Sequence, residues 1–158
     1  LSSKYKYLGN DSMIEILVEK YRNVFICIGQ IKNSDKRKNI FEKLINLKAK
    51  IPTILSENCY VSHESHIDIG TIIMHGAIIN ANTSIGKNCI INSQALIEHD
   101  VVLGSHNHIS TGVKVNGNVK IGNGVFIGSG AIIKEGVNIG SNNFIPAGTF
   151  ITKDLPKK

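Results

Sequence analysis

Tryptophan is absent from this sequence of 158 residues, and proline and cysteine occur only three times each. Cys27, Cys59 and Cys89 are far apart and odd in number, so they form neither a disulfide framework nor a Cys-x-x-Cys site. Such cysteine usage fits a reducing compartment, and we expect a cytoplasmic protein. No apolar run approaches the roughly 18 residues of a transmembrane helix, so we expect no membrane span.

Acidic residues are also few, with 12 Asp and Glu against 18 Lys and Arg, for a net charge of +6. The excess lies in residues 1–57, which hold 11 basic and 6 acidic side chains, against 7 and 6 in residues 58–158. These basic side chains either form a solvated helix face or attract the phosphates of a nucleotide or cofactor. No aromatic residues interleave with them, which argues against nucleic-acid binding.

Isoleucine, asparagine and glycine are abundant instead, with 27, 17 and 15 copies. Every sixth residue from Val61 to Ile151 is aliphatic, sixteen positions in all, without exception or insertion. The residue four positions later is mostly small or β-branched. Six residues make one short strand and a corner, and three such units close one triangular coil of about 18 residues. The sequence therefore predicts a mainly β protein, with a parallel β-helix of about five coils over residues 58–158.

Residues 1–57 do not share this period. The Ser-x-x-Glu pattern at residues 12–15 resembles a capping box and predicts a helix to about residue 20. The continuous apolar run at residues 24–28 is typical of a buried parallel strand. Residues 34–47 predict a second amphipathic helix. This order indicates a partial Rossmann-like α/β segment that lacks the first strand and its Gly-rich turn.

Several short stretches accompany the repeat: Phe25–Gly29, Lys36–Lys38, Ile79–Ala81, Ile90–Asn92, Ile97–Asp100, His108–Ser110 and Gly117–Val119. With them, the chain resembles the hexapeptide-repeat acyltransferases, in particular the PglD/NeuD-like sugar acetyltransferases. The resemblance implies a left-handed coil, a homotrimer with active sites between subunits, a nucleotide-sugar substrate and acetyl-CoA as the acyl donor. In that subgroup a Gly-rich loop precedes such a segment and a tail follows it, so we expect a piece of a longer protein.

Among six histidines, His99 stands out by its neighbours. On an 18-residue coil it shares a column with Ala81 and Gly117, whose small side chains leave room for a ligand. The adjacent Asp100 is suited to fix the imidazole tautomer and to stabilise the imidazolium. These residues alone leave a plain surface histidine open. The resemblance implies that His99 is a general base and Asp100 its partner.

The resemblance assigns the other site positions too. It implies acetyl-CoA contacts at His108, Gly117, Ser129 and Ala147, and nucleotide-sugar contacts at Gly29, Gln30 and Arg37. His108 would help to polarise the thioester, and the backbone N–H of Gly117 would approach its oxygen. Taken without the resemblance, the nucleotide-sugar positions fit a strand-end turn and a helix-face charge equally well.

We therefore predict an acetyl-CoA-dependent enzyme that acetylates the 4-amino group of a nucleotide-linked deoxysugar in bacterial glycan biosynthesis. The alternatives are O-acetylation of a sialic-acid-like sugar and a non-catalytic trimeric scaffold. A zinc hydratase is a third alternative, because His63 and His99 are two coils apart. It would need another histidine a few residues after His99, where Gly104 stands, so we expect no metal.

Overall fold

Each six-residue unit of the repeat forms one two-residue strand followed by a corner. The computed structural model describes residues 5–158. Its strands are β1 (Ile54–Leu55), β2 (Tyr60–Val61), β3 (His66–Ile67), β4 (Ile72–Ile73), β5 (Ile78–Ile79), β6 (Ser84–Ile85), β7 (Ile90–Ile91), β8 (Leu96–Ile97), β9 (Val102–Leu103), β10 (His108–Ile109), β11 (Lys114–Val115), β12 (Lys120–Ile121), β13 (Phe126–Ile127), β14 (Ile132–Ile133), β15 (Asn138–Ile139), β16 (Phe144–Ile145) and β17 (Phe150–Ile151).

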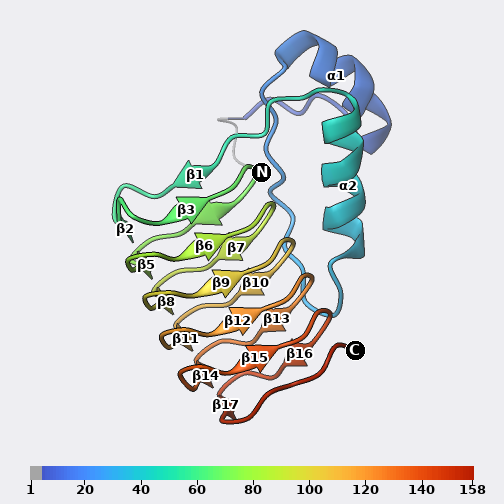
Figure 1. The fold of residues 1–158 in the computed structure, drawn as a ribbon. Helices are drawn as coiled ribbons and strands as arrows, with labels where there is room; N and C mark the ends of the chain where they lie inside the picture. Colours follow the sequence, from blue (N-terminus) through green and yellow to red (C-terminus); the bar gives the residue numbers. More distant parts are fainter. Residues whose placement is uncertain (1–4) are drawn as a thin grey trace.

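These strands stack into three parallel sheets that form the sides of a solenoid (Figure 1). The β1 sheet holds β1, β4, β7, β10, β13 and β16; the β2 sheet holds β2, β5, β8, β11, β14 and β17; the β3 sheet holds β3, β6, β9, β12 and β15. The register is 18 residues throughout, as where Ile72 pairs with Ile90 and Ile90 with His108. The predicted parallel β-solenoid of about five coils is confirmed.

The core is a column of aliphatic side chains inside the coils. From β4 to β16 the second residue of every strand is buried, and Ile73, Ile91 and Ile109 have no exposed surface. Each such side chain contributes roughly 1.5–3 kcal/mol of transfer free energy. Cys89 fills an inner corner of this column, and burial raises the pKa of its thiol to about 12. Cys89 is therefore a protonated core residue.

Glycines mark one edge of the solenoid, where each coil lies directly on the next. A Cβ atom on Gly122 would lie 2.6 Å from the backbone nitrogen of Ser141 and 2.9 Å from its Cα. We expect Gly122→Ala to lower the free energy of unfolding by about 1–3 kcal/mol, because backbone cannot move aside as a side chain can. Urea denaturation measures this. Gly29→Ala is the control, since its Cβ would meet nothing within 4 Å, and an equal loss there would contradict the explanation.

Two helices precede the solenoid, and Figure 1 shows α2 beside the stacked coils. A 3-10 turn, η1 (Asp11–Met13), leads into α1 (Ile14–Tyr21), and α2 covers Asp35–Asn46. Both predicted helices are confirmed, but the predicted capping box is wrong. The Asn10 side chain accepts the hydrogen bond from the Ser12 N–H. No helix in the described part of the chain is long and apolar enough to cross a membrane.

The predicted strand at residues 24–28 is wrong. In the described chain before β1 the structure contains no sheet, only an isolated bridge between Asn23 and Lys50, so a Rossmann-like segment is not supported. Arg37 explains part of this outcome. Its guanidinium donates to the carbonyls of Ile26 and Ile28 at 2.7 and 2.8 Å, where a neighbouring strand would otherwise bind.

Candidate functional site

The corner between β8 and β9 places three ionisable side chains, those of Glu98, His99 and Asp100, on one edge of the solenoid. The neighbouring coils fix its backbone from both sides: Asp100 N–H donates to the carbonyl of Ala81, and the His99 carbonyl accepts from Asn118 N–H, each at 3.0 Å. Asp100 has a φ of 60°, a left-handed conformation that Asp adopts more readily than most residues. The backbone of this corner is therefore fixed by its neighbours, and it positions the three side chains.

His99 and Asp100 form a hydrogen-bonded pair in the solvent. The imidazole Nδ1 lies 2.8 Å from Asp100 Oδ2, and the two side chains are 62% and 51% exposed. Hydrogen bonds from His99 and then Asn82 lower the pKa of the Asp100 carboxyl, which is ionised at neutral pH. A carboxylate only accepts hydrogen bonds, so a neutral imidazole carries its proton on Nδ1. The lone pair is then on Nε2, which is able to accept a proton.

Gly117 lies against the ring of His99. A Cβ atom on Gly117 would be 2.8 Å from both Cε1 and Nε2 of His99. We expected the small residues of this column to leave room for a ligand. On the Gly117 side, the imidazole itself occupies that room. The absence of a side chain at Gly117 thus determines where the ring lies.

His108 belongs to a different part of the solenoid, because β10 lies in the β1 sheet. Its Nδ1 lies 2.7 Å from the carbonyl oxygen of Gln30, to which it donates. Its Nε2 faces the amide nitrogen of Asn92 at 3.4 Å, and the ring contacts Phe126 edge-on. Burial lowers the pKa of His108, against the opposing effect of the Gln30 hydrogen bond. His108 is thus neutral at pH 7, with Nε2 as an acceptor.

A pocket of about 240 Å³ lies between residues 25–29 and the β1 sheet. Its lining consists of residues 25–29 together with Arg37, Ile72, Met74, Ile90, Asn92 and His108. Asn92 lies in one of the stretches that carry the family resemblance, but its position in this pocket was not predicted. The 18-residue register was the available signal, since it places Asn92 at the end of β7, beside β10.

The two polar side chains expected to hold a nucleotide sugar are buried. Gln30 is 6% exposed and donates from Nε2 to the carbonyl of His106 at 2.6 Å. Arg37 is 1% exposed and donates only to backbone carbonyls, including those of Gly70 and Asn88 in the solenoid. Both side chains are thus engaged within the chain, and contacts of Gln30 and Arg37 with a nucleotide sugar stay a prediction. The two side chains attach the N-terminal part to the coils, whereas Gly29 is exposed.

Of the four predicted acetyl-CoA positions, His108 lies in the β1 sheet and the other three lie on two edges of the solenoid. Gly117 follows β11 on the edge between the β2 and β3 sheets, with His99. Ser129 and Ala147 are exposed one coil apart, after β13 and β16, on the edge between the β1 and β2 sheets. Within one chain the structure does not bring these two groups together. Among residues 5–158 no three His, Cys, Asp or Glu side chains gather as a metal site.

Stability is expected to fall in mildly acidic solution because His106 is partly buried under α2. Its Nδ1 lies 2.9 Å from Asn88 Nδ2, its ring packs edge-on against Phe41, and burial lowers its pKa from 6.5. The unfolded chain then binds more protons below pH 6.5, so stability is full above that pH and decreases as pH falls toward the lowered value. Thermal unfolding between pH 5.5 and 8 measures this. His106→Asn should reduce the slope, and the remainder would come from His108, whose pKa is also lowered by burial; an unchanged slope would contradict the assignment.

Known proteins resemble the chain in sequence and in fold. Residues 82–117 and 118–153 match the family described as bacterial transferase hexapeptide (six repeats). A mutant of perosamine N-acetyltransferase from Caulobacter crescentus, in complex with CoA and GDP-perosamine, is 28% identical; the match has a TM-score of 0.90 and covers 96% of this chain and 71% of that one. The acetyltransferase domain of PglB from Neisseria gonorrhoeae, in complex with acetyl coenzyme A, is 26% identical. That match has a TM-score of 0.89 and covers 99% of this chain and 75% of the other.

Proposed function

We propose that this chain, in which residues 82–117 and 118–153 match the hexapeptide repeats of bacterial transferases, is an acetyl-CoA-dependent sugar N-acetyltransferase. The observation that carries the proposal is the exposed His99–Asp100 pair, which leaves Nε2 of the imidazole free to act as a base. The acceptor would be the amino group of a nucleotide-linked deoxysugar in bacterial glycan biosynthesis. The perosamine enzyme, bound to CoA and GDP-perosamine, supports both substrate classes.

In the proposed reaction, the sugar amine attacks the thioester carbonyl of acetyl-CoA while His99 Nε2 accepts a proton from it. A C–N bond forms, the C–S bond breaks, and the thiol of CoA leaves with one proton. Asp100 stabilises the imidazolium that forms in between. General-base action of this kind contributes typically about 10²–10⁴-fold. A covalent route through Cys89 is unfavourable, because its thiol is buried and its pKa is about 12.

The acyl donor would lie near His108, Gly117, Ser129 and Ala147. His108 takes a different part from the one expected, since Nδ1 already donates to Gln30 and Nε2 has no proton with which to polarise a thioester. We assign Nε2 to exchange its 3.4 Å contact with the amide of Asn92 for an N–H of the donor's amide-containing arm. Stabilising the thioester oxygen is left to the backbone N–H of Gly117.

A site that combines both histidines requires two copies of the chain. The solenoid is triangular in section, His108 projects from the β1 sheet, and His99 lies on the opposite edge, between the β2 and β3 sheets. This arrangement supports a homotrimer with active sites between subunits. The left-handed coil and the cytoplasmic location expected from the sequence are kept as predictions.

The test is thiol release from acetyl-CoA, with GDP-perosamine and a panel of UDP- and GDP-linked 4-amino-4,6-dideoxy sugars as acceptors. Release with one amino sugar, and a product acetylated on nitrogen, is the expected result. Release only with sugars that offer a hydroxyl would replace the proposal with O-acetylation. If the protein binds no acetyl-CoA, it is a scaffold and not an enzyme.

A further inference from the structure

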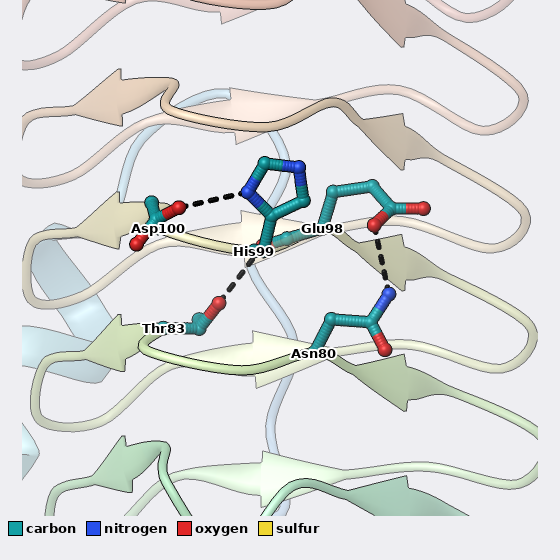
Figure 2. Close-up of polar contacts among 5 residues, drawn as sticks. All are labelled: Asn80, Thr83, Glu98, His99 and Asp100. Carbon is teal, nitrogen blue, oxygen red and sulfur yellow. Dashed lines mark hydrogen bonds and ion pairs between the residues drawn. The ribbon is translucent and has the colours of Figure 1, made fainter.

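The carboxylate of Glu98 lies on the opposite side of the His99 ring from Asp100, as Figure 2 shows. Asp100 contacts Nδ1, so Glu98 flanks the side of the ring on which Nε2 is free. The backbone of Glu98 is held from both neighbouring coils: its N–H donates to the carbonyl of Val115 at 2.9 Å, and its carbonyl accepts from the Thr83 hydroxyl at 2.8 Å. The backbone at Glu98 is therefore held by both neighbouring coils, as it is at His99.

A neutral amide, and no cation, orients this carboxylate. Asn80, one coil earlier in the same column, donates from Nδ2 to Glu98 Oε2 at 2.8 Å (Figure 2). Within the described residues, none of the ion pairs includes Glu98. The lysine of this column, Lys134, is two coils away and lies 3.9 Å from Glu135. Glu98 thus presents a half-buried, oriented negative charge beside the proposed base.

We propose that Glu98 binds the ammonium group of the acceptor sugar and holds it against His99 Nε2, with Asn80 as the residue that positions the carboxylate. This inference rests on the proposed function and names the group that selects amines. A sugar amine is mostly protonated at neutral pH and cannot attack a thioester in that form. Glu98 attracts the cation, and His99 Nε2 takes one of its three protons to give the free amine.

Conversion of the ammonium group to the amide releases two protons, and each of them has an acceptor. His99 passes the first proton to solvent. Its Nε2 then accepts the second proton, as the amine forms the C–N bond, and passes it to the departing sulfur. Of the two protons released, one leaves with the thiol of CoA and the other passes to solvent. A hydroxyl acceptor carries no charge and gains much less from Glu98. The carboxylate therefore favours amines over hydroxyls at the stage of acceptor binding.

The experiment compares Glu98→Gln with wild type in steady-state acetylation of GDP-perosamine by the full chain. We expect KM for the amino sugar to rise about 10- to 100-fold, the effect of losing one charge-assisted hydrogen bond, with a smaller change in kcat. Asn80→Ala should raise KM by about 2- to 10-fold, as for a neutral hydrogen bond. Calorimetric binding of GDP-perosamine without acetyl-CoA gives a readout independent of turnover and should weaken in parallel.

The matched control is Glu57→Gln, which removes the same charge from a different corner, the one between β1 and β2. Equal KM values and equal binding for Glu98→Gln, Glu57→Gln and wild type would overturn the inference and leave the proposed function standing. So would an equal loss with the analogue that carries a hydroxyl in place of the amino group. A wild-type protein that acetylates no amino sugar would overturn both.

Discussion

Replacing His99 with alanine should lower kcat/KM for acetyl transfer by about 10²–10⁴-fold, because the proposed base is removed. The fold should be unaffected, since the side chain is 62% exposed and lies outside the buried column. Asp100→Asn keeps a group able to contact Nδ1 but removes the charge that stabilises the imidazolium. We therefore expect a smaller loss there. Thiol release under saturating acetyl-CoA measures both variants.

His63→Ala is the matched control for His99→Ala. His63 is exposed at the same edge of the solenoid, two coils earlier, without Asp100 or Gly117 beside it. The His63→Ala variant should retain wild-type activity. A His99→Ala variant that is as active as His63→Ala would show that the corner histidine is not the base. Unfolding curves for both variants separate a catalytic effect from a loss of folded protein.

Gly117→Ala should lower activity by about 100-fold and leave stability nearly unchanged. The added Cβ would meet the imidazole of His99 at 2.8 Å, and an exposed ring rotates away at small cost. Displacing a catalytic group by about 1 Å costs on the order of 10²-fold in rate. Paired measurements of kcat/KM and of the urea unfolding midpoint test this directly.

Gly122→Ala should have the opposite effects on activity and stability from those of Gly117→Ala. Its Cβ meets the backbone of Ser141 on another edge, so it should reduce stability while the folded fraction keeps its specific activity. If Gly117→Ala instead destabilised the protein as strongly as Gly122→Ala and its folded fraction were fully active, Gly117 would be a stacking residue only. The ring position of His99 would then have a different cause.

The solenoid could be predicted from the sequence because each coil needs aliphatic side chains at the same inward-facing positions. One inward aliphatic residue every six positions leaves a periodic pattern, and the 18-residue coil follows from it. The same register places Gly117 beside His99 and Asn80 beside Glu98. The periodic pattern therefore predicted the coil and placed His99 in one column with Gly117, whereas the contact of Asn80 with Glu98 and that of Asn92 with His108 were not predicted.

The N-terminal part could not be predicted in this way, because its contacts are not periodic. An apolar run such as residues 24–28 becomes a strand only if a partner strand lies beside it, and no local pattern supplies that information. Arg37 was expected either to contact the nucleotide sugar or to be a charge on a helix face. Its burial depends on carbonyl groups from three separate segments, at Ile28, Gly70 and Asn88. The tautomer of His108 likewise depends on Gln30, 78 residues away.

The 18-residue register also restricts how such a chain can change in length during evolution. An insertion of six residues between Asn82 and His99 would move every later column to the next edge and separate Asp100 from its partner Asn82. An insertion of 18 residues adds one whole turn, and all columns keep their alignment. A duplicated turn therefore fits without any compensating change. Homologous chains should therefore differ in height by whole turns, while the turns that hold Asn80, His99 and Gly117 stay adjacent.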